Sequence, residues 1–373
     1  GALPYLWEQL RCPVYATPFA AAALRHKTQG RRGVLPAPLI EVTPGDRSLI
    51  GPFSVEWIPV THSTPETCAL CISVGQTRIL HTADWKIDAA PVVGPAWSDK
   101  RFEALGVEGV DAVICDSTNA LQAGRSVTEG RVAQGLTEVI QRCEGRVVVG
   151  CFSSNIARIQ TLSQIAADTG RYLSVLGRSA AGMANCAQQV GLFPSQFKPI
   201  HAEHLGYLPP REVLAIATGS QGESGAALHR LVAQTHPHLS LDAGDTVILS
   251  SRTIPGNEAS VARLIEGFRA RGIHVLEADS SDTPLHASGH PYQDELRDLY
   301  QLLKPSLVVP VHGEAPHMAA NARIAKQSGA SAALTGVNGD LFYLSPVPGV
   351  RRRYAPVGRL QWCEDTERLI NVS

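Results

Sequence analysis

The feature that most constrains the fold is a regular alternation of apolar runs and amphipathic segments that begins at about residue 125. The apolar runs have the length of buried strands, and they lie at residues 146–151, 172–176, 213–217, 246–250 and 274–277. The segments between them have helical periodicity, which is clearest at residues 155–169, from residue 182 onwards and at residues 258–271. Because strands that alternate with helices form parallel sheets covered by helices, this region predicts an α/β domain.

The sequence on either side has a different pattern. Short β-rich runs at residues 54–60, 69–74 and 78–81 predict strands, with turns at Gly51 and Gly75. Further helices are predicted at residues 4–11, 18–27 and 316–328 and after residue 290, and further strands at residues 13–16, 112–115 and 307–311. A final hairpin-like stretch is predicted to reach residue 348, followed by a tail that begins at the basic residues 351–353. The length of 373 residues is enough for two domains.

Side chains that can bind metals follow four of the predicted strands. His62 follows the strand at 54–60 and Asp84 the strand at 78–81, while Asp116 and His312 follow those at 112–115 and 307–311. Functional groups of sheet folds collect at strand ends, and His and Asp are suitable ligands for zinc or manganese. One carboxylate can bridge two metals about 3.5–4 Å apart, so His62, Asp84 and His312 are candidates for a binuclear site. A histidine after a strand is also a common hydrogen-bonded turn residue, and spacing alone leaves both interpretations open.

A second group of candidates lies in small polar loops. His286 and His290 flank Ser288-Gly289 just before a helix predicted from about Pro291. The N–H groups of a helix start favour phosphate, and a nearby histidine can protonate an alkoxide leaving group. The alternative is a polar cap with two exposed imidazoles. Four more polar loops follow predicted strands, at residues 152–155, 177–179, 218–223 and 254–258. Each alone is a helix N-cap, but four on one sheet edge indicate a surface for a phosphodiester chain.

Bulk composition does not identify a ligand. The net charge is −1, so any basic track for a nucleic acid must be local. Hydrophobic residues make up 44% and charged residues 18%, which is typical of a folded protein. The eight cysteines show no disulfide framework, and Cys68 and Cys71 lie in an alternating segment that we interpret as a buried strand. With no long apolar stretch and no signal-peptide pattern, the sequence predicts a cytoplasmic protein.

The motifs, taken together and in order, resemble those of the ribonuclease J family, a branch of the β-CASP metallo-β-lactamase nucleases. The matching segments are residues 1–6 (GALPYL), 60–63 (VTHS), 81–86 (HTADWK), 116–119 (DSTN), 152–156 (FSSNI), 218–223 (TGSQGE), 254–258 (IPGNE), 286–290 (HASGH) and 310–314 (PVHGE). Nine ordered matches over nearly the whole chain are far more specific than any one of them.

The resemblance implies an α/β fold in which an incomplete metallo-β-lactamase αββα sandwich carries an inserted β-CASP domain. Residues 1–124 would form the first part of the metallo-β-lactamase domain without its N-terminal strands, and residues 125–285 the β-CASP domain. Residues 286–348 would return to the metallo-β-lactamase domain, and residues 349–373 would be a linker toward a C-terminal domain.

The resemblance also implies roles for individual residues. His62 would bind a first zinc ion, Asp84 would bridge two ions and His312 would bind the second, with manganese or magnesium as alternatives to zinc. Asp116, His290 and His312 would match three β-CASP motifs, and His290 would be a proton donor. The implied catalytic residues are therefore Asp84, Asp116 and His290. The implied contacts to RNA phosphates, including a 5′-monophosphate, are Ser153, Ser154, Asn155, His286, Ser288 and His290.

One departure from the family pattern is large. The His-x-His-x-Asp-His ligand motif, expected immediately before Gly1, is not in the sequence, so three of seven expected ligands are present. We therefore expect a fragment that binds zinc poorly and does not hydrolyse RNA. Smaller departures are Ala83 and Trp85, which stand where the family usually has Gly and Phe and are expected to be conservative.

The expected function of the complete protein is that of a zinc-dependent RNA 5′–3′ exonuclease and endonuclease in RNA processing and decay, with a metal-bound hydroxide as the nucleophile. It would act on 5′-monophosphorylated single-stranded RNA as a homodimer or homotetramer. Two alternatives are a metal-free RNA-binding relative or inactive partner subunit, and a small-molecule metallohydrolase. The β-CASP motifs argue against the metallohydrolase. The retained residues His62, Asp84, Asp116, His290 and His312 argue against the inactive relative.

Overall fold

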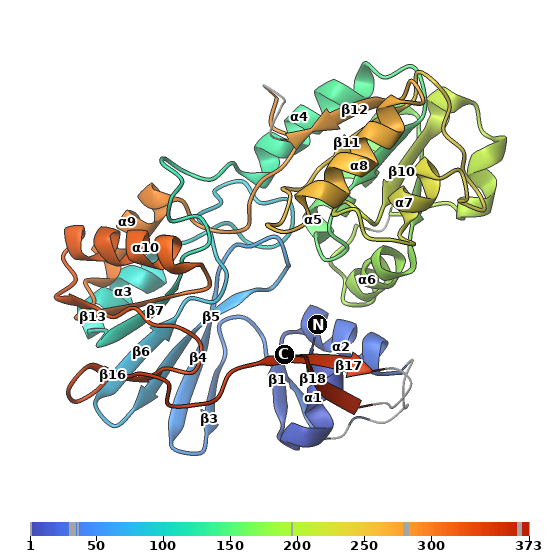
Figure 1. Ribbon diagram of the computed structural model, residues 1–373. Coiled ribbons are helices and arrows are strands. Elements are labelled where there is room, and N and C mark those ends of the chain that lie inside the picture. The colour runs from blue at the N-terminus through green and yellow to red at the C-terminus, as the bar shows by residue number, and fades with distance from the viewer. Residues whose placement is uncertain are drawn as a thin grey trace.

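The structure, a computed structural model, describes residues 2–29, 35, 37–194, 197–278, 283–363 and 368–372. Two large sheets dominate it, one of seven strands and one of five, and they lie side by side in Figure 1. Within the described ranges, a helix with both the length and the apolar character needed to cross a bilayer is absent.

The seven-stranded sheet is mixed. Its strands, in spatial order, are β14 (Ala332–Ala333), β13 (Leu307–Val311), β7 (Ala112–Asp116), β6 (Thr77–His81), β5 (Cys68–Val74), β4 (Phe53–Pro59) and β3 (Arg47–Ile50). Strands β3 to β6 form an antiparallel meander, whereas β6, β7, β13 and β14 run parallel to one another. The parallel neighbours β6, β7 and β13 therefore end at the same edge of the sheet.

Alternation along the strands divides the side chains of this sheet between two faces. Val113 and Val308 pack under the helices α3 (Lys100–Glu108), α9 (Gln293–Leu303) and α10 (Ala315–Gln327). Their neighbours Ala112 and Val309 face the opposite side, toward Phe342 of the hairpin β15 (Leu341–Tyr343) and β16 (Gly349–Arg351).

The five-stranded sheet is wholly parallel. Its strands, in spatial order, are β12 (His274–Glu277), β11 (Thr246–Leu249), β8 (Val147–Gly150), β10 (Val213–Ala217) and β9 (Tyr172–Leu176). One face packs against α4 (Glu129–Gln141), α5 (Ile156–Thr169) and α6 (Arg178–Gln189), and the other against α7 (Ala227–Val232) and α8 (Glu258–Arg269). The predicted α/β architecture is confirmed, and the four polar loops do follow strands that end at one edge of this sheet.

The remaining elements form a smaller group, which Figure 1 shows below α6. It contains α1 (Leu3–Leu10), the parallel pair β1 (Val14–Ala16) and β2 (Leu39–Glu41), α2 (Pro18–Gln29) and the hairpin β17 (Arg359–Cys363) and β18 (Arg368–Val372). Helix α2 contacts α6, and the Tyr5 and Trp362 rings lie 5.0 Å apart between their centroids. Two short 3₁₀ helices, η1 (Ala202–Tyr207) and η2 (Pro210–Glu212), precede β10.

One local prediction was wrong, the start of a helix. The helix predicted from residue 182 begins at Arg178, because Gly177 at φ +110° turns the chain directly from β9 into α6. Gly182 lies inside the helix, where a Cβ would come within 2.4 Å of the His26 ring on α2. The predicted tail at residues 351–353 is partly ordered by Asp340, whose carboxylate pairs with Arg352 and accepts the Arg353 N–H.

The end of the chain contains regular secondary structure, which a plain linker would lack. Residues 349–373 contain strands β16, β17 and β18. The domain boundaries themselves, including the role of this segment as a linker, stay predictions.

A buried carboxylate ties the two sheets together next to the strand ends. Glu295 on α9 is fully buried and accepts hydrogen bonds from the Ile87, Ser126 and Tyr292 backbone N–H groups, at 2.8–2.9 Å, and from the Ser126 hydroxyl at 2.7 Å. The donors come from the loop after β6, from the segment that leads into the five-stranded sheet and from the start of α9. Because all four are donors, only a carboxylate satisfies them all.

The Glu295→Gln protein is therefore expected to lose about 2–4 kcal/mol of unfolding free energy, since the new amide N–H group faces donors that are left unpaired. Urea denaturation checks this. The matched control is Asp298→Asn on the same helix, which removes only the partly exposed pair with Arg125 and is expected to cost less than about 1 kcal/mol. Equal losses in the two variants would contradict the role given to Glu295.

Candidate metal centre and phosphate-binding site

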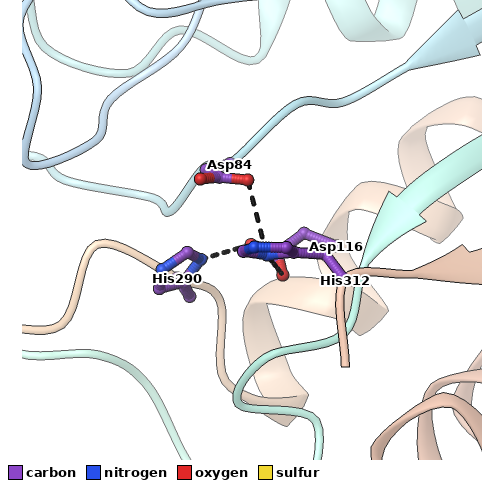
Figure 2. A group of neighbouring side chains, drawn as sticks. All are labelled: Asp84, Asp116, His290 and His312. Atoms are coloured by element: carbon purple, nitrogen blue, oxygen red, sulfur yellow. Dashed lines mark hydrogen bonds and ion pairs between the residues drawn. The ribbon is translucent and has the colours of Figure 1, made fainter. Parts of the chain in front are cut away.

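Two of the three predicted metal ligands, Asp84 and His312, meet Asp116 and His290 at the carboxyl edge of the seven-stranded sheet, and the third, His62, lies beside them. Asp116 ends β7, His312 follows β13 and Asp84 lies three residues after β6, while His290 comes from the loop before α9. Ligand atoms of these four residues all lie within 4.8 Å of one another. Figure 2 shows the four side chains gathered at this point. Because β6, β7 and β13 are parallel neighbours, the fold itself brings the three strand-end residues together.

Asp116 is the centre of this group. Its buried carboxylate accepts hydrogen bonds from the Thr118 N–H at 2.9 Å and the Thr118 hydroxyl at 2.7 Å, and from His290 Nδ1 at 2.6 Å. His312 Nδ1 lies 3.3 Å from the other side of the carboxylate. Burial alone would raise the pKa of Asp116, but the hydrogen bonds from the two histidines outweigh it and hold this pKa far below its usual range. The carboxylate is therefore ionised.

His290 is oriented by this contact. Its Nδ1–H donates to Asp116, so the Nε2 lone pair remains available. The ring lies between two others, with centroids 5.2 Å from that of His62 and 5.4 Å from that of His312. A histidine whose Nδ1 is held by a carboxylate typically binds a metal or transfers a proton through its Nε2.

His62 lies beside the four-residue group. Its Nδ1 donates to the Gly289 carbonyl at 2.7 Å, and its Nε2 lies 4.0 Å from an Asp84 oxygen. Burial lowers the pKa of His62, which keeps the ring neutral, the form that binds metals. Position 289 requires glycine, because a Cβ there would come within 2.5 Å of the His62 ring.

Asp84 faces two imidazoles with its two oxygens. One oxygen lies 3.5 Å from His312 Nδ1 and the other 4.0 Å from His62 Nε2. The hydrogen bond to Asp116 raises the pKa of His312, and Asp84 adds to this effect. The two carboxylates thus favour the protonated form of His312, and a metal ion bound here would compete with that proton.

The backbone next to Asp84 is strained. Ala83 has φ +53°, in the left-handed region, and its N–H donates to His81 Nδ1 at 3.0 Å. A Cβ costs about 1–2 kcal/mol there, which explains why glycine suits this position. Trp85, the other departure from the family pattern, is fully buried and packs against the Trp97 ring at 5.3 Å.

Ala83→Gly is accordingly expected to raise the unfolding free energy by about 1 kcal/mol, because the strain is relieved while the loop keeps its hydrogen bonds. Ala167→Gly, at an exposed position within α5, provides the matched control and is expected to lower it by about as much. Thermal unfolding of both variants measures the two changes. A loss of stability in Ala83→Gly would contradict the strain.

The side chains of the loop at residues 286–290 are partly buried, whereas the alternative interpretation predicted two exposed imidazoles. Ser288 Oγ accepts from the Asn119 side chain at 2.7 Å and from the His290 N–H at 3.3 Å. His286 is half-buried, and burial, together with the charges of Arg158 and Arg252, lowers its pKa to about 3. Its buried Nδ1 has no hydrogen-bond partner among the described residues. The interpretation of two exposed imidazoles is therefore wrong.

The loop at residues 152–155 follows β8 in the other sheet. The Asn155 side chain is buried and accepts from the Arg158 N–H at 3.0 Å, so it caps α5 as the alternative interpretation predicted. Ser153 and Ser154 are half-buried and make no side-chain hydrogen bond among the described residues. Their contact with phosphate stays a prediction, as does that of Asn155. The structure does not join this loop directly to the Asp116 group.

Three residues that the sequence did not single out support the centre. Thr118 bonds Asp116, and its hydroxyl lies 2.9 Å from His312 Nδ1. Asn321 on α10 is fully buried and donates to the Asp116 carbonyl at 3.0 Å. Asn119 connects the loop after β7 to Ser288 and to the His290 carbonyl. Thr118 and Asn119 were visible as neighbours of Asp116 in one motif, whereas Asn321 gave no local signal.

Two family models match segments of this chain. Residues 144–268 match the family model described as "Ribonuclease J, beta-CASP domain", and residues 283–334 match the "Zn-dependent metallo-hydrolase RNA specificity domain". The second match contains His286, His290 and His312. A crystal structure of a protein of unknown function from Enterococcus faecalis V583 is similar in fold, with a TM-score of 0.60 at 14% identity over 86% of this chain and 73% of that one.

Curated relatives extend the match over nearly the whole chain. The chain is 42% identical to "Ribonuclease J" of Sinorhizobium meliloti over 96% of its own length and 64% of that protein. It is 36% identical to "Ribonuclease J 1" of Streptococcus pyogenes over 84% of its own length and 56% of that protein. It thus spans about three-fifths of the length of these relatives. The fold is that of a metallo-β-lactamase protein with an inserted β-CASP domain. The chain belongs to the ribonuclease J family.

Proposed function

We propose that this chain provides the RNA-binding region and part of the metal centre of a ribonuclease that hydrolyses RNA phosphodiesters. The observation that carries the proposal is the position of Asp84, whose two oxygens face His62 on one side and His312 on the other. A carboxylate between two imidazoles is the arrangement expected of a ligand that bridges two metal ions.

The donor set fits a divalent metal. Two carboxylates and two imidazoles converge within 4.8 Å, which suits zinc and also manganese. Asp84 and His312 would hold one ion, with Asp84 and His62 contributing to a second. Zinc is the proposed metal, with manganese or magnesium as alternatives. When bound, such ions supply Lewis-acid activation of water and of the phosphate.

The chain's own residues provide the other steps. Asp116 accepts a hydrogen bond from His290 Nδ1–H and fixes the ring, so His290 Nε2 points away from the carboxylate. We assign His290 the transfer of a proton to the leaving oxygen of the RNA: Nε2 takes up a proton from solvent and gives it to that oxygen, while Asp116 positions the ring. Asn119 and Ser288 hold the loop that carries His290, which fixes the donor relative to Asp84.

The proposed substrate is single-stranded RNA, preferably with a 5′-monophosphate. Support comes from four polar loops at the carboxyl edge of the parallel sheet and from the loop at residues 286–290 beside the metal centre. Ser153, Ser154, Asn155, His286 and Ser288 are the proposed phosphate contacts, together with His290. Backbone N–H groups at helix starts favour phosphate at such an edge.

Two further properties belong to the proposal. Following the family, the full-length protein would act as a homodimer or homotetramer in RNA processing and decay. A cytoplasmic location is supported by the unpaired thiols of Cys68, Cys71 and Cys115, because a reducing compartment keeps thiols unpaired.

RNA binding by this chain tests the substrate assignment without requiring cleavage. Fluorescence anisotropy compares a 3′-labelled single-stranded RNA that carries a 5′-monophosphate with the same RNA that carries a 5′-hydroxyl. We expect both to bind and the monophosphorylated RNA to bind more tightly. Absence of binding to either RNA would contradict the proposed function, and equal affinities would contradict the 5′-monophosphate preference.

A further inference from the structure

Arg252 reaches from one sheet to the other. It follows β11 of the five-stranded sheet, and its Nη1 donates to the Asn119 side-chain oxygen at 3.1 Å, in the loop after β7 of the seven-stranded sheet. β11 and β7 belong to the two separate bodies visible in Figure 1. The guanidinium therefore lies where the two sheets face each other, next to the loop that carries Asp116.

One amide connects Arg252 to the proposed proton donor. The Asn119 side chain accepts from Arg252 and donates to Ser288 Oγ at 2.7 Å and to the His290 carbonyl at 3.3 Å. Asn119 is buried, so these contacts are protected from water. A change in the position of the Arg252 guanidinium would therefore shift Asn119 and, with it, the loop that carries His290.

The charge of Arg252 is unbalanced. The side chain is half-buried, and no carboxylate lies within 4.0 Å of it among the described residues. By contrast, the half-buried Arg101 pairs with Glu56 at 2.7 Å, and the fully buried Arg158 pairs with Glu129 at 3.1 Å. A guanidinium has five donors, and Arg252 uses one of them in the described structure. Unused donors on a partly buried cation favour an anionic ligand, and phosphate matches their planar geometry.

The loop that carries Arg252 is held in place. Gln221 is buried, and its side chain donates to the Arg252 carbonyl at 3.0 Å and accepts from the Ile254 N–H at 2.8 Å. These two bonds clamp the backbone on both sides of residue 253. The guanidinium is therefore presented by a fixed loop, which reduces the entropy lost when it binds an anion.

We propose that Arg252 binds a phosphate of the RNA backbone between the two sheets and, through Asn119, positions the loop that carries His290. This inference rests on the proposed function and adds a binding and positioning residue to it. The neighbouring His286 is neutral at ordinary pH, because its pKa is lowered to about 3 by burial and by the charges of Arg158 and Arg252. Arg252 rather than His286 thus supplies positive charge at this point.

The test is RNA binding by this chain as a function of salt. Arg252→Gln, Arg252→Lys and a matched control, Arg263→Gln, are compared by anisotropy on 5′-monophosphorylated single-stranded RNA. Arg263 is exposed on α8 and contacts Ser260, so its substitution removes the same charge away from the sheet boundary. Circular dichroism and thermal unfolding establish that each variant is folded.

We expect Arg252→Gln to weaken binding about tenfold at low salt. The slope of log affinity against log salt should become shallower by about 0.7, the value for one lost phosphate contact on a single strand. Arg252→Lys should restore most of the slope, because it keeps the charge. Arg263→Gln should leave affinity and slope unchanged.

Two results would overturn the inference while the proposed function stands. One is an unchanged affinity in folded Arg252→Gln. The other is weaker binding with an unchanged slope, which is the signature of a purely structural role. If the unsubstituted chain binds no RNA, the proposed function fails and the inference fails with it, so the two failures are distinguishable.

Discussion

Asp84→Ala is expected to abolish RNA hydrolysis and to leave RNA binding largely intact. The appropriate protein is a fusion in which the segment of the Sinorhizobium meliloti relative that precedes its match to this chain is joined to residue 1. That segment is chosen to carry the family's His-x-His-x-Asp-His motif, and we call the product the joined protein. It supplies the ligands that the present sequence does not contain.

The physical reason lies in the geometry of Asp84. Its oxygens are 3.5 Å from His312 Nδ1 and 4.0 Å from His62 Nε2, so its loss would remove the proposed bridging ligand from both sides of the centre. Loss of a residue that only orients a metal ligand costs about 10–100-fold, and a bridging ligand should cost more than about 100-fold. RNA binding depends on other residues and should change little.

Cleavage of 5′-monophosphorylated RNA in the presence of zinc, together with anisotropy, measures both quantities. Glu103→Ala, at an exposed position on α3, is the control and should retain cleavage. Cleavage by the Asp84→Ala protein at a rate close to that of the unsubstituted joined protein would remove Asp84 from the bridging role.

The second large effect is expected for Asp116→Asn. The amide keeps the shape of the side chain but loses the charge that holds His290 and His312. General acid catalysis contributes about 10²–10⁴-fold, so the joined protein should lose at least about 100-fold in cleavage rate as His290 loses its orientation.

The effect of Asp116→Asn can also be measured in the 373-residue chain alone, through the pKa of His312. The hydrogen bond to Asp116 is the main reason that the pKa of His312 is raised. In Asp116→Asn, NMR titration should find this pKa lowered toward the ordinary value of about 6.5. Asp340→Asn removes a carboxylate whose contacts are with Val337, Arg352 and Arg353 and should leave the His312 titration unchanged. An unchanged His312 pKa in Asp116→Asn would contradict the geometry.

The pH dependence of stability follows from these two pKa shifts. A raised pKa means that protonated His312 stabilises the fold, and this contribution is complete below about pH 6.5 and is lost as pH rises through the raised value. The lowered pKa of Asp116 acts in the opposite direction, with a contribution present above about pH 3.9 and lost as pH falls through the native value. Asp116→Asn should remove the second dependence and weaken the first.

Much of the fold followed from local sequence patterns. Strand β10 has the predicted bounds, Val213–Ala217, because five consecutive apolar residues lie between polar segments in a sheet buried on both faces. The same logic placed Asp116 and His312 at strand ends. Their approach to one another required only that β7 and β13 be parallel neighbours, which the fold class favours.

Other features depend on contacts that no local pattern reports. The start of α6 depends on the positive φ of Gly177, and the place of Gly182 depends on the His26 ring of another helix. Glu295 looks like an ordinary helix-surface residue, yet it is buried and satisfies donors from three segments. The contact between Arg252 and Asn119 joins two different sheets, so it can be recognised only from the three-dimensional structure. The sequence alone thus indicated the candidate ligands and Asp116, but not Glu295, Arg252 or Asn321, whose contacts depend on packing between distant segments.

The most direct test of the account is metal analysis of the joined protein together with cleavage of 5′-monophosphorylated RNA. We predict two zinc ions per joined chain and efficient hydrolysis, and weak zinc binding with no hydrolysis for the 373-residue chain by itself. Folded joined protein that binds RNA but hydrolyses none with zinc, manganese or magnesium would contradict the assignment of Asp84, Asp116, His290 and His312 to a nuclease centre. Tight equimolar zinc binding by the chain alone would contradict the claim that its ligand set is partial.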